Sequence, residues 1–266
     1  MITLQDIARL RARVAHWRAA GDRIGFVPTM GNLHQGHLEL VRRARGAAQR
    51  VVVSVFVNPM QFGPGEDFNS YPRTLEQDRA KLAAEGVDLL FAPGVEAIYP
   101  HGSGETTRIE VPQVSRGLCA DFRPGHFTGV ATVVGRLFNL VQPDVAVFGE
   151  KDFQQLAVIR RMVEDLGWPV ELESVDTVRE EDGLAMSSRN AYLKPHQRAS
   201  ALSLYRSLIH ARACVESGEI EARTLIEQAR ERISACPETA IDYIAVVDAE
   251  TLADMPSVQG PTRMLL

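Results

Sequence analysis

Short apolar segments that alternate with helical patterns constrain the fold of this chain more than any other feature. Residues 51–57 (VVVSVFV) form an almost continuous apolar run rich in β-branched residues, which is typical of a strand buried on both faces of a parallel sheet. Comparable short runs occur at 24–28, 88–91 and 144–148, and the segment 170–175 alternates more between apolar and polar residues. Helical periodicity separates them at 36–49, 75–85, 128–141 and 152–166. This order predicts an α/β fold, a Rossmann-like parallel sheet with helices on both faces.

The last third of the chain has a different pattern. Helical periodicity covers residues 195–217 and 222–235, and strand patterns follow at 241–247 and in the final TRMLL segment. Two domains are therefore expected, a Rossmann-like domain over 1–176 and a smaller C-terminal α+β domain over 177–266. In open parallel sheets ligands bind at the carboxyl ends of the strands, so the loops that follow the apolar runs are the places to search for a site.

Charge and composition exclude several classes of protein. The net charge is −5 and the sequence pI is about 5.8, which argues against a nucleic acid as partner. Three cysteines, an odd number, fit a reducing compartment better than a disulfide framework. The N-terminal stretch, from the first residue to Gly21, has an amphipathic, charged helical pattern without the apolar core of a signal peptide, and no segment approaches the length of a membrane span. We expect a cytoplasmic protein with no membrane partner.

The segment PTMGNLHQGHL at 28–38 follows the first apolar run and opens a predicted helix. Its glycines have the spacing of a Walker A phosphate loop, but His37 and Leu38 stand where that motif needs Lys and Ser or Thr. A helix N-terminus favours an anion through its free N–H groups and its dipole. His34 and His37, three residues apart, would share one helix face and direct two imidazole N–H groups at that anion. Gly36 would let the anion approach closely.

Two other interpretations of this histidine pair stay open. In the first, one histidine caps the helix and the other is a solvated surface residue. In the second, the pair binds zinc, although no third Cys, His or acidic ligand follows at a familiar spacing.

Two more polar segments follow apolar runs directly. Asn58 and Gln61, after the 51–57 run, offer neutral donors and acceptors suited to hydroxyls and a carboxylate, although Asn-Pro is also a common turn. After the 144–148 run, Lys151 suits a phosphate, Asp152 is placed to cap the next helix, and Gln155 is placed to face the same cleft. Both segments are therefore candidates for ligand binding.

The segment MSSRN at 186–190 places two hydroxyls and a guanidinium in a row. Such a run can wrap a phosphate with charge-assisted hydrogen bonds, or it can be an ordinary surface loop. No Ser, Cys or Thr stands beside a matching base in an arrangement that would make a nucleophile. The set of segments therefore indicates positioning and electrostatic catalysis on a nucleotide.

Several of these segments also resemble the motifs of a known family. PTMGNLHQGH resembles the H-x-G-H signature of the nucleotidyltransferase superfamily, which includes class I aminoacyl-tRNA synthetases, and MSSRN resembles a degenerate form of its KMSKS-type loop. More specifically, residues 24–193 resemble the pantothenate synthetase family. Five motifs in order carry this resemblance: PTMGNLHQGH, VNPMQFGPGEDFNSYPRT, RPGHFTGV, FGEKDFQQL and DGLAMSSRN.

The resemblance implies an activity and its substrates. Members of the family join (R)-pantoate to β-alanine at the expense of ATP, through a pantoyl adenylate, and release pyrophosphate and AMP. Mg²⁺ would accompany ATP, and the family suggests a homodimer. The domain 1–176 would bind nucleotide and pantoate, and the domain 177–266 would close over ATP.

The resemblance also assigns residues. His37 would be the proton donor, with His34 beside it on the phosphates. Gln61 and Gln155 would bind pantoate, Gln61 also β-alanine, and Asp78 would help to hold Mg²⁺. The residues implied for ATP binding are Met30, Gly31, Asn32, Leu33, His34, Gln35, Gly36, His37, Gly149, Glu150, Lys151, Asp152, Val178, Met186, Ser187, Ser188 and Arg189.

Two rival functions remain to be separated from this one. A different nucleotidyltransferase would move AMP onto a phosphate acceptor, but Gln61 and Gln155 argue against it because such an acceptor calls for basic residues. A non-catalytic nucleotide- or RNA-binding module would turn over no ATP, and the acidic pI weighs against RNA.

Overall fold

The computed structural model describes all 266 residues, and the chain divides into two compact units. The first comprises Met1–Ser115 and Arg123–Val178, and the second comprises Arg116–Phe122 and Arg179–Leu266. The units part after Val178, close to the predicted boundary at 176/177, and the short insertion Arg116–Phe122 had no sequence signal. The functions predicted for the two domains stay predictions.

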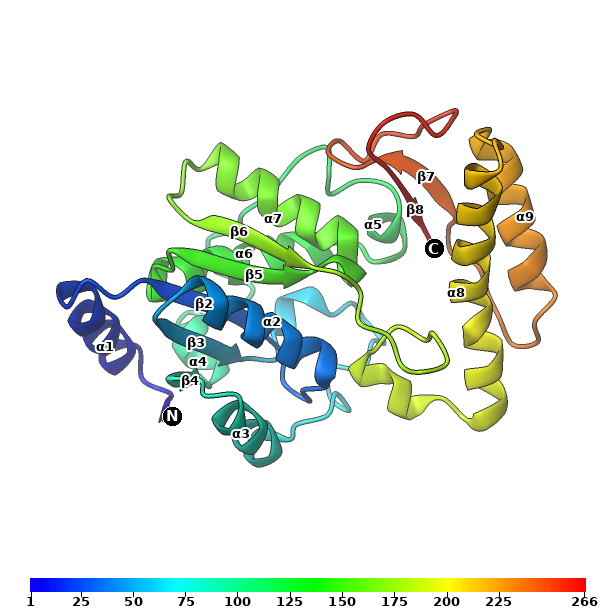
Figure 1. Cartoon of the computed structure of the whole chain (residues 1–266). Helices are drawn as coiled ribbons and strands as arrows, with labels where there is room; N and C mark the ends of the chain where they lie inside the picture. Colours follow the sequence, from blue (N-terminus) through cyan, green and yellow to red (C-terminus); the bar gives the residue numbers. More distant parts are fainter. The chain divides into compact units, whose positions relative to one another are not determined.

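The first unit alternates strands and helices along the chain (Figure 1). Its elements are β1 (Ile2–Leu4), α1 (Ile7–Ala19), β2 (Ile24–Thr29), α2 (Gln35–Ala47), β3 (Arg50–Val55), the 3₁₀ turn η1 (Pro59–Gln61), α3 (Leu75–Ala84), β4 (Leu89–Phe91), α4 (Val95–Ile98), α6 (His126–Val141), β5 (Val145–Gly149), the 3₁₀ turn η2 (Glu150–Asp152), α7 (Phe153–Asp165) and β6 (Glu171–Val175).

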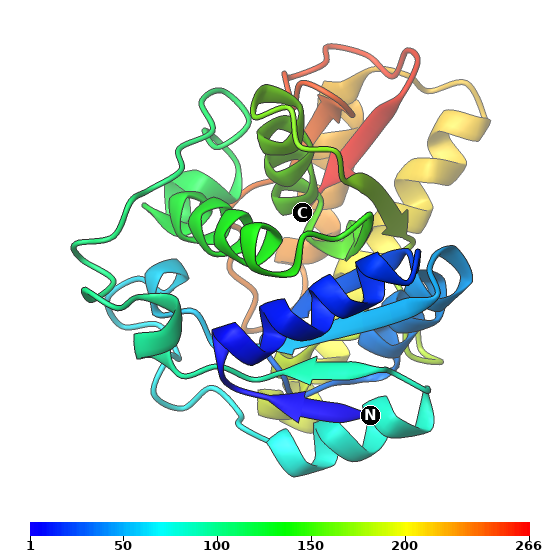
Figure 2. The same ribbon diagram turned by 90° about the vertical axis from the view of Figure 1, so that its left-hand side faces the viewer.

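The strands form one six-stranded sheet in the order β1-β4-β3-β2-β5-β6, and every pairing is parallel. Helices α1, α6 and α7 cover one face, and α2 and α3 cover the other (Figures 1 and 2). Continuous apolar runs make the central strands because both of their faces are covered by helices. The predicted α/β architecture is confirmed.

The N-terminus differs from the prediction. Its helical pattern indicated one helix from the first residues, but Ile2–Leu4 form β1, which pairs with β4 at the edge of the sheet. The strand has three residues, too few for any periodicity to mark it. Helix α1 then begins after Asp6, whose carboxylate accepts the N–H of Arg9 at 2.8 Å.

Three strands end where the polar loops begin. β2 ends at Thr29, β3 at Val55, two residues earlier than predicted, and β5 at Gly149. The first two ends are tied together, since the Thr29 hydroxyl donates to the Ser54 carbonyl at 2.8 Å and Phe56 N–H donates to the Thr29 carbonyl at 3.0 Å. Parallel pairing therefore brings the loops after these strands to one edge of the sheet.

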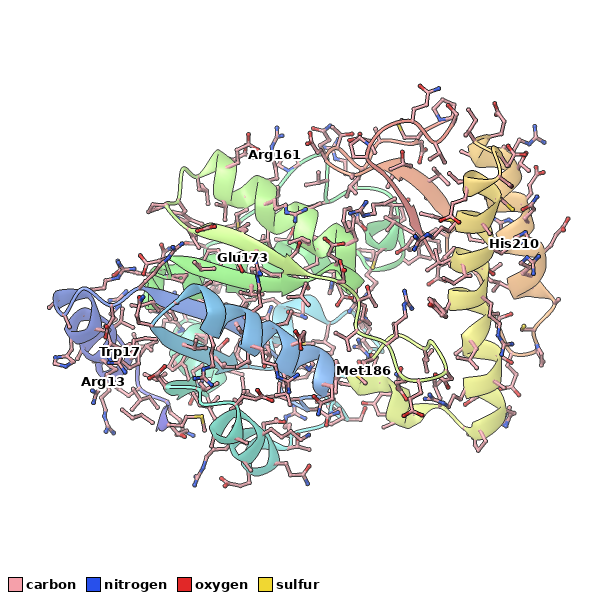
Figure 3. All side chains as sticks on the ribbon, viewed as in Figure 1. Arg13, Trp17, Arg161, Glu173, Met186 and His210 are labelled. Carbon is pink, nitrogen blue, oxygen red and sulfur yellow. The ribbon has the colours of Figure 1, made fainter.

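The second unit is a smaller α+β assembly. Helices α8 (Pro195–Glu216) and α9 (Ala222–Ser234) pack side by side, and β7 (Ala245–Asp248) pairs antiparallel with β8 (Thr262–Leu265). The helix α5 (Cys119–Phe122) and the 3₁₀ turn η3 (Ser188–Tyr192) complete it. The strand predicted at 241–247 begins four residues later than expected. His210 of α8 hydrogen-bonds Gln228 of α9 at 3.1 Å (Figure 3).

None of the helices in the chain is both long enough and apolar enough to cross a membrane.

Candidate active site

The loop between β2 and α2 has an unusual backbone. Gly31 and Asn32 both have left-handed φ angles, +84° and +50°. Glycine takes this region freely, and Asn is among the few other residues that tolerate it. A Cβ added to Gly31 would also lie 2.9 Å from Val55 Cγ1 and 3.1 Å from an Asp78 carboxylate oxygen. The loop therefore needs glycine at 31 for both conformation and space.

The two histidines meet at the start of α2. His34 occupies the N-cap position, with φ −125° and ψ 176°, and His37 lies in the first helical turn. Their ring centroids are 4.0 Å apart and the planes are tilted by 37°. The rings are thus neighbours as predicted, although His34 lies at the N-cap position before the helix rather than on its face.

Gly36 also leaves space for the neighbouring histidine. A Cβ at this position would meet His34 Cε1 at 2.9 Å and Nδ1 at 3.0 Å. The missing side chain therefore makes room for the His34 ring itself. Val178, which precedes the second unit, lies 3.7 Å from the same point, so it belongs to the surroundings of this loop.

The surroundings of His37 favour a neutral imidazole. Burial and then the neighbouring His34 lower the pKa of His37 to about 3. Its Nδ1 accepts the backbone N–H of His34 at 3.3 Å, in the manner of a capping box. A neutral imidazole carries one proton, so an acceptor at Nδ1 places that proton on Nε2. His37 therefore offers Nε2–H to a ligand at pH 7.

Gln61 is held at the carboxyl end of β3 by Asn58. Asn58 Nδ2 donates to the Gln61 side-chain oxygen at 3.2 Å and to the Gly129 carbonyl at 3.0 Å. Its Oδ1 accepts from Tyr99 Oη at 2.8 Å, and both Asn58 and Gln61 are buried. Gln61 Nε2 in turn donates to Met30 Sδ at 3.1 Å, which joins this turn to the histidine loop.

Arg123 and His126 contact the backbone carbonyl of Gln61, and the sequence analysis did not single out either residue. Arg123 makes two hydrogen bonds to the Glu66 carboxylate, at 2.9 and 2.6 Å, and donates to the Gln61 carbonyl at 3.3 Å. His126 Nδ1 lies 2.8 Å from that carbonyl. The Arg123 hydrogen bonds hold the pKa of Glu66 below its usual range. The motifs GPGEDF and RPGHFTGV contain these residues, but their 57-residue separation gave no sign of contact.

The end of β5 contributes charged residues. Lys151 Nζ lies 3.2 Å from Asp152 Oδ1, and both side chains are exposed. Asp152 is the residue before α7, as predicted, although its side chain makes no capping hydrogen bond there. Glu150 accepts from Ser174 Oγ at 3.0 Å. Gln155 is half-buried in the first turn of α7, so it is more accessible than its buried neighbour Gln154.

Met186–Arg189 belong to the second unit, in the loop between β6 and α8 (Figure 3). The Ser187 hydroxyl accepts the N–H of Arg189 at 3.2 Å and so begins the turn η3. Asn190 steadies the loop through Glu180 Oε1 at 2.8 Å and the Ala185 carbonyl at 3.0 Å. The segment is therefore an ordered turn within its own unit.

The structure places Asp78 against the histidine loop. Its carboxylate accepts the N–H groups of Asn32 at 2.9 Å and Leu33 at 2.8 Å, and the hydroxyl of Thr74 at 3.1 Å. The side chain is fully buried. No three His, Cys, Asp or Glu side chains gather into a group that could hold a metal ion. The hydrogen bonds of Asp78 do not fit a metal ligand. The zinc interpretation of the two histidines has no third ligand.

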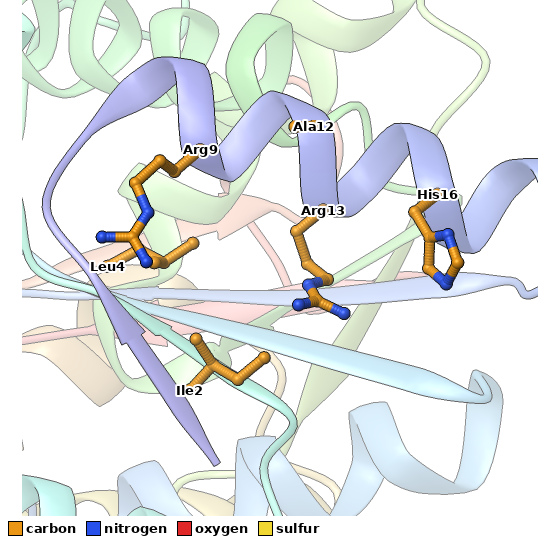
Figure 4. A pocket seen from close by; sticks show the side chains of 6 residues that line it. All are labelled: Ile2, Leu4, Arg9, Ala12, Arg13 and His16. Atoms are coloured by element: carbon orange, nitrogen blue, oxygen red, sulfur yellow. The ribbon is translucent and has the colours of Figure 1, made fainter.

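A pocket lies elsewhere in the first unit, against β1 and α1 (Figure 4). Ile2 and Leu4 form its apolar side, and Arg9, Arg13 and His16 project from α1. It contains none of the candidate site residues.

Fold and site together define an α/β enzyme of Rossmann-like architecture, with a glycine–histidine loop opening a helix at the carboxyl edge of its sheet. The model of the pantoate-beta-alanine ligase family matches residues 2–266, and the chain belongs to that family. It is accordingly a ligase that joins pantoate to β-alanine in pantothenate biosynthesis.

Individual relatives agree with this assignment. A pantothenate synthetase from Moorella thermoacetica is 53% identical over 266 residues, which cover 100% of this chain and 93% of the relative. The crystal structure of pantothenate synthetase from Thermus thermophilus has a TM-score of 0.92 and 53% identity, with 99% and 93% of the two chains covered. A pantoate-beta-alanine ligase from Francisella tularensis, solved with beta-gamma ATP and beta-alanine, has a TM-score of 0.81 and 34% identity, with 92% and 88% covered.

Proposed function

We propose that this enzyme uses ATP to activate pantoate as a pantoyl adenylate. The pantoate carboxylate attacks the α-phosphorus of ATP, and the α–β phosphoanhydride bond breaks to release pyrophosphate. The β-alanine amine then attacks the acyl carbon, loses a proton and expels AMP. The observation that carries the proposal is the histidine pair at the start of α2, with ring centroids 4.0 Å apart. The Francisella tularensis relative, bound to beta-gamma ATP and beta-alanine, supports ATP and β-alanine as substrates.

The histidine loop is the proposed phosphate site. The amides of Asn32 and Leu33 already donate to Asp78, so the backbone donors left for an anion are the first-turn N–H groups of α2 at Gln35 and Gly36. His37 adds the Nε2–H of a neutral ring. Such preorganised donors stabilise charge that grows on the pyrophosphate oxygens as the bond breaks.

Gln61 and Gln155 are the proposed residues for pantoate, and Gln61 also for β-alanine. Both are neutral amides, which can bind hydroxyl and carboxylate groups without adding charge. Gln61 is held from two sides, through its side chain by Asn58 and through its carbonyl by Arg123. A residue fixed in this way loses little entropy when substrate binds, which suits it to aligning the attacking carboxylate.

The remaining assignments belong to the same proposal. Gly149–Asp152 and Val178 contribute to ATP binding from the first unit, and Met186–Arg189 contribute from the second, which closes over ATP. Lys151 and Arg189 bring cations that suit a triphosphate. We also propose a cytoplasmic homodimer.

Magnesium is expected as the counterion of ATP. Mg²⁺ in nucleotide sites is held largely by phosphate oxygens and waters, with one or two carboxylates. Because the contacts of Asp78 do not fit a metal ligand, no step above depends on a protein-held ion.

The test is the exchange of labelled pyrophosphate into ATP. Exchange that depends on pantoate but not on β-alanine is expected, and full turnover should give AMP and pyrophosphate rather than ADP and phosphate. His37→Ala should reduce exchange about 10²–10³-fold, the scale of a lost transition-state donor. His101→Ala, at an exposed histidine, is the control and should leave the rate unchanged. Exchange without pantoate, or ADP as product, would refute the adenylate mechanism.

A further inference from the structure

We propose that Asp78 and Lys81 of α3 are positioning residues that hold the histidine loop in its ligand-binding conformation, and that Asp78 is not a magnesium ligand. The inference rests on the proposed function, because it concerns how the phosphate site of that function is shaped.

Three donors already occupy the carboxylate of Asp78. One oxygen accepts Leu33 N–H at 2.8 Å, and the other accepts Asn32 N–H at 2.9 Å and the Thr74 hydroxyl at 3.1 Å. Thr74 is the residue before α3, and its side chain makes no capping bond of its own. A metal ion here would compete with these donors for the carboxylate. Because Asp78 is fully buried, a backbone amide that lost its bond would find no water to replace it.

Lys81 also binds the histidine loop. Its Nζ donates to the Leu33 carbonyl at 2.6 Å. Lys81 and Asp78 are three residues apart on α3, so they stand on one helix face. Leu33 is therefore bound at both its N–H and its C=O by one helix, more than 40 residues away in the sequence.

The conformation of the histidine loop depends on these hydrogen bonds with Asp78 and Lys81. Gly31 and Asn32 both have left-handed φ angles, and a Cβ added to Gly31 would lie 3.1 Å from an Asp78 carboxylate oxygen. Binding the amides of Asn32 and Leu33 turns them toward α3, so the next free amides are those that begin α2. Burial and His34 lower the pKa of His37 most, and the positive charge of Lys81 acts in the same direction. Asp78 and Lys81 thus act on ATP through the loop and need not touch it.

The experiment compares Asp78→Asn, Lys81→Met and Lys81→Arg with Glu76→Gln, whose side chain is 81% exposed on the same helix. Pantoate-dependent exchange is measured as a function of ATP and, separately, of Mg²⁺ at fixed ATP. Asp78→Asn replaces one acceptor oxygen by an NH₂ group that repels an amide. We expect kcat/KM for ATP to fall about 10²-fold, the effect of misplacing a binding group by about 1 Å. The Mg²⁺ concentration for half-maximal rate should not change.

Lys81→Met should lower kcat/KM for ATP about 10-fold, the scale of one lost charge-assisted hydrogen bond, and Lys81→Arg should restore part of it. Lys81 is exposed, so its variants test the proposal even if Asp78→Asn does not fold, which circular dichroism will show. Glu76→Gln should match wild type.

Two results would overturn the inference. If Asp78→Asn raises the half-maximal Mg²⁺ concentration 10-fold or more and recovers at saturating Mg²⁺, Asp78 is a metal ligand. If folded Asp78→Asn and Lys81→Met both keep wild-type kcat/KM for ATP, the loop needs no such hold. A wild-type enzyme without pantoate-dependent exchange would instead refute the proposed function, so the two failures are distinguishable.

Discussion

Gly129→Ala is expected to damage pantoate binding through a single methyl group, although it lies in a helix where alanine is normally preferred. Gly129 stands in α6 where that helix packs on the turn η1. A Cβ there would lie 2.4 Å from the Met60 carbonyl oxygen, 2.5 Å from its carbon and 2.8 Å from Gln61 N. All three are backbone atoms, so no side chain can rotate out of the way.

The size of the effect follows from these distances. Normal contact requires about 3.5 Å, so the turn and the helix must separate by roughly 1 Å. Overpacking of this kind costs about 1–3 kcal/mol. Weakening the 3.0 Å bond from Asn58 to the Gly129 carbonyl adds about 1 kcal/mol, and the helix propensity of alanine returns about 1 kcal/mol. A net loss of about 1–3 kcal/mol in the free energy of unfolding is expected.

Function should suffer more than stability. Gln61 sits on the displaced turn, and a shift of about 1 Å in a positioning residue can cost about 10²-fold in rate. Urea unfolding gives the stability, and initial rates over a range of pantoate concentrations give kcat/KM. Gly46→Ala is the matched control, because an added Cβ there meets nothing within 4 Å, and it should stabilise by about 0.5–1 kcal/mol. Wild-type kcat/KM for pantoate in a folded Gly129→Ala enzyme would refute the assignment of Gln61.

Three further outcomes are expected. The pKa of His37 is lowered to about 3 in the folded chain, so between pH 6.5 and 3 the unfolded chain binds a proton that the folded chain does not. The stability contributed by the neutral ring is therefore full above pH 6.5, and about 2 kcal/mol of it is lost by pH 5. His37→Gln should make the free energy of unfolding, measured in urea, depend less on pH between 7 and 5. Arg123→Lys loses the two-bond contact with Glu66 and should raise KM for pantoate about 10-fold while kcat changes less. Gly183→Ala, at φ +95° with a Cβ 2.1 Å from the Tyr205 ring, should destabilise the second unit by about 2–3 kcal/mol in thermal unfolding.

Each of these has a control within the chain. His101→Gln should leave the pH dependence as it is, and equal slopes for His37→Gln and wild type would contradict a suppressed pKa. Arg161→Lys changes an exposed i,i+4 pair with Asp165 and should leave KM unaltered. Gly260→Ala has a φ of +68° but no neighbour within 4 Å, so it should cost less than Gly183→Ala.

Local sequence patterns were sufficient to predict the architecture and the positions of the main loops. Buried parallel strands such as Val51–Val55 need apolar residues on both faces, and helices need a 3.6-residue period, so each element leaves a mark within its own few residues. Strand β1 was missed because three residues carry no period. The family motifs then identified the histidine loop and the segments after β3 and β5.

The chain by itself thus determined the α/β fold, the order of its elements and the residue types available for phosphate and carboxylate binding. Only the tertiary structure decided which groups those residues contact. In the folded chain His34 lies before the helix, and its ring occupies the space next to Gly36. Asp78 accepts hydrogen bonds from amides 45 and 46 residues away, and Arg123 donates to the Gln61 carbonyl across 62 residues. The physical reason is that periodicity records burial, which is local, whereas a hydrogen bond depends on which distant groups the packed sheet and helices bring within about 3 Å.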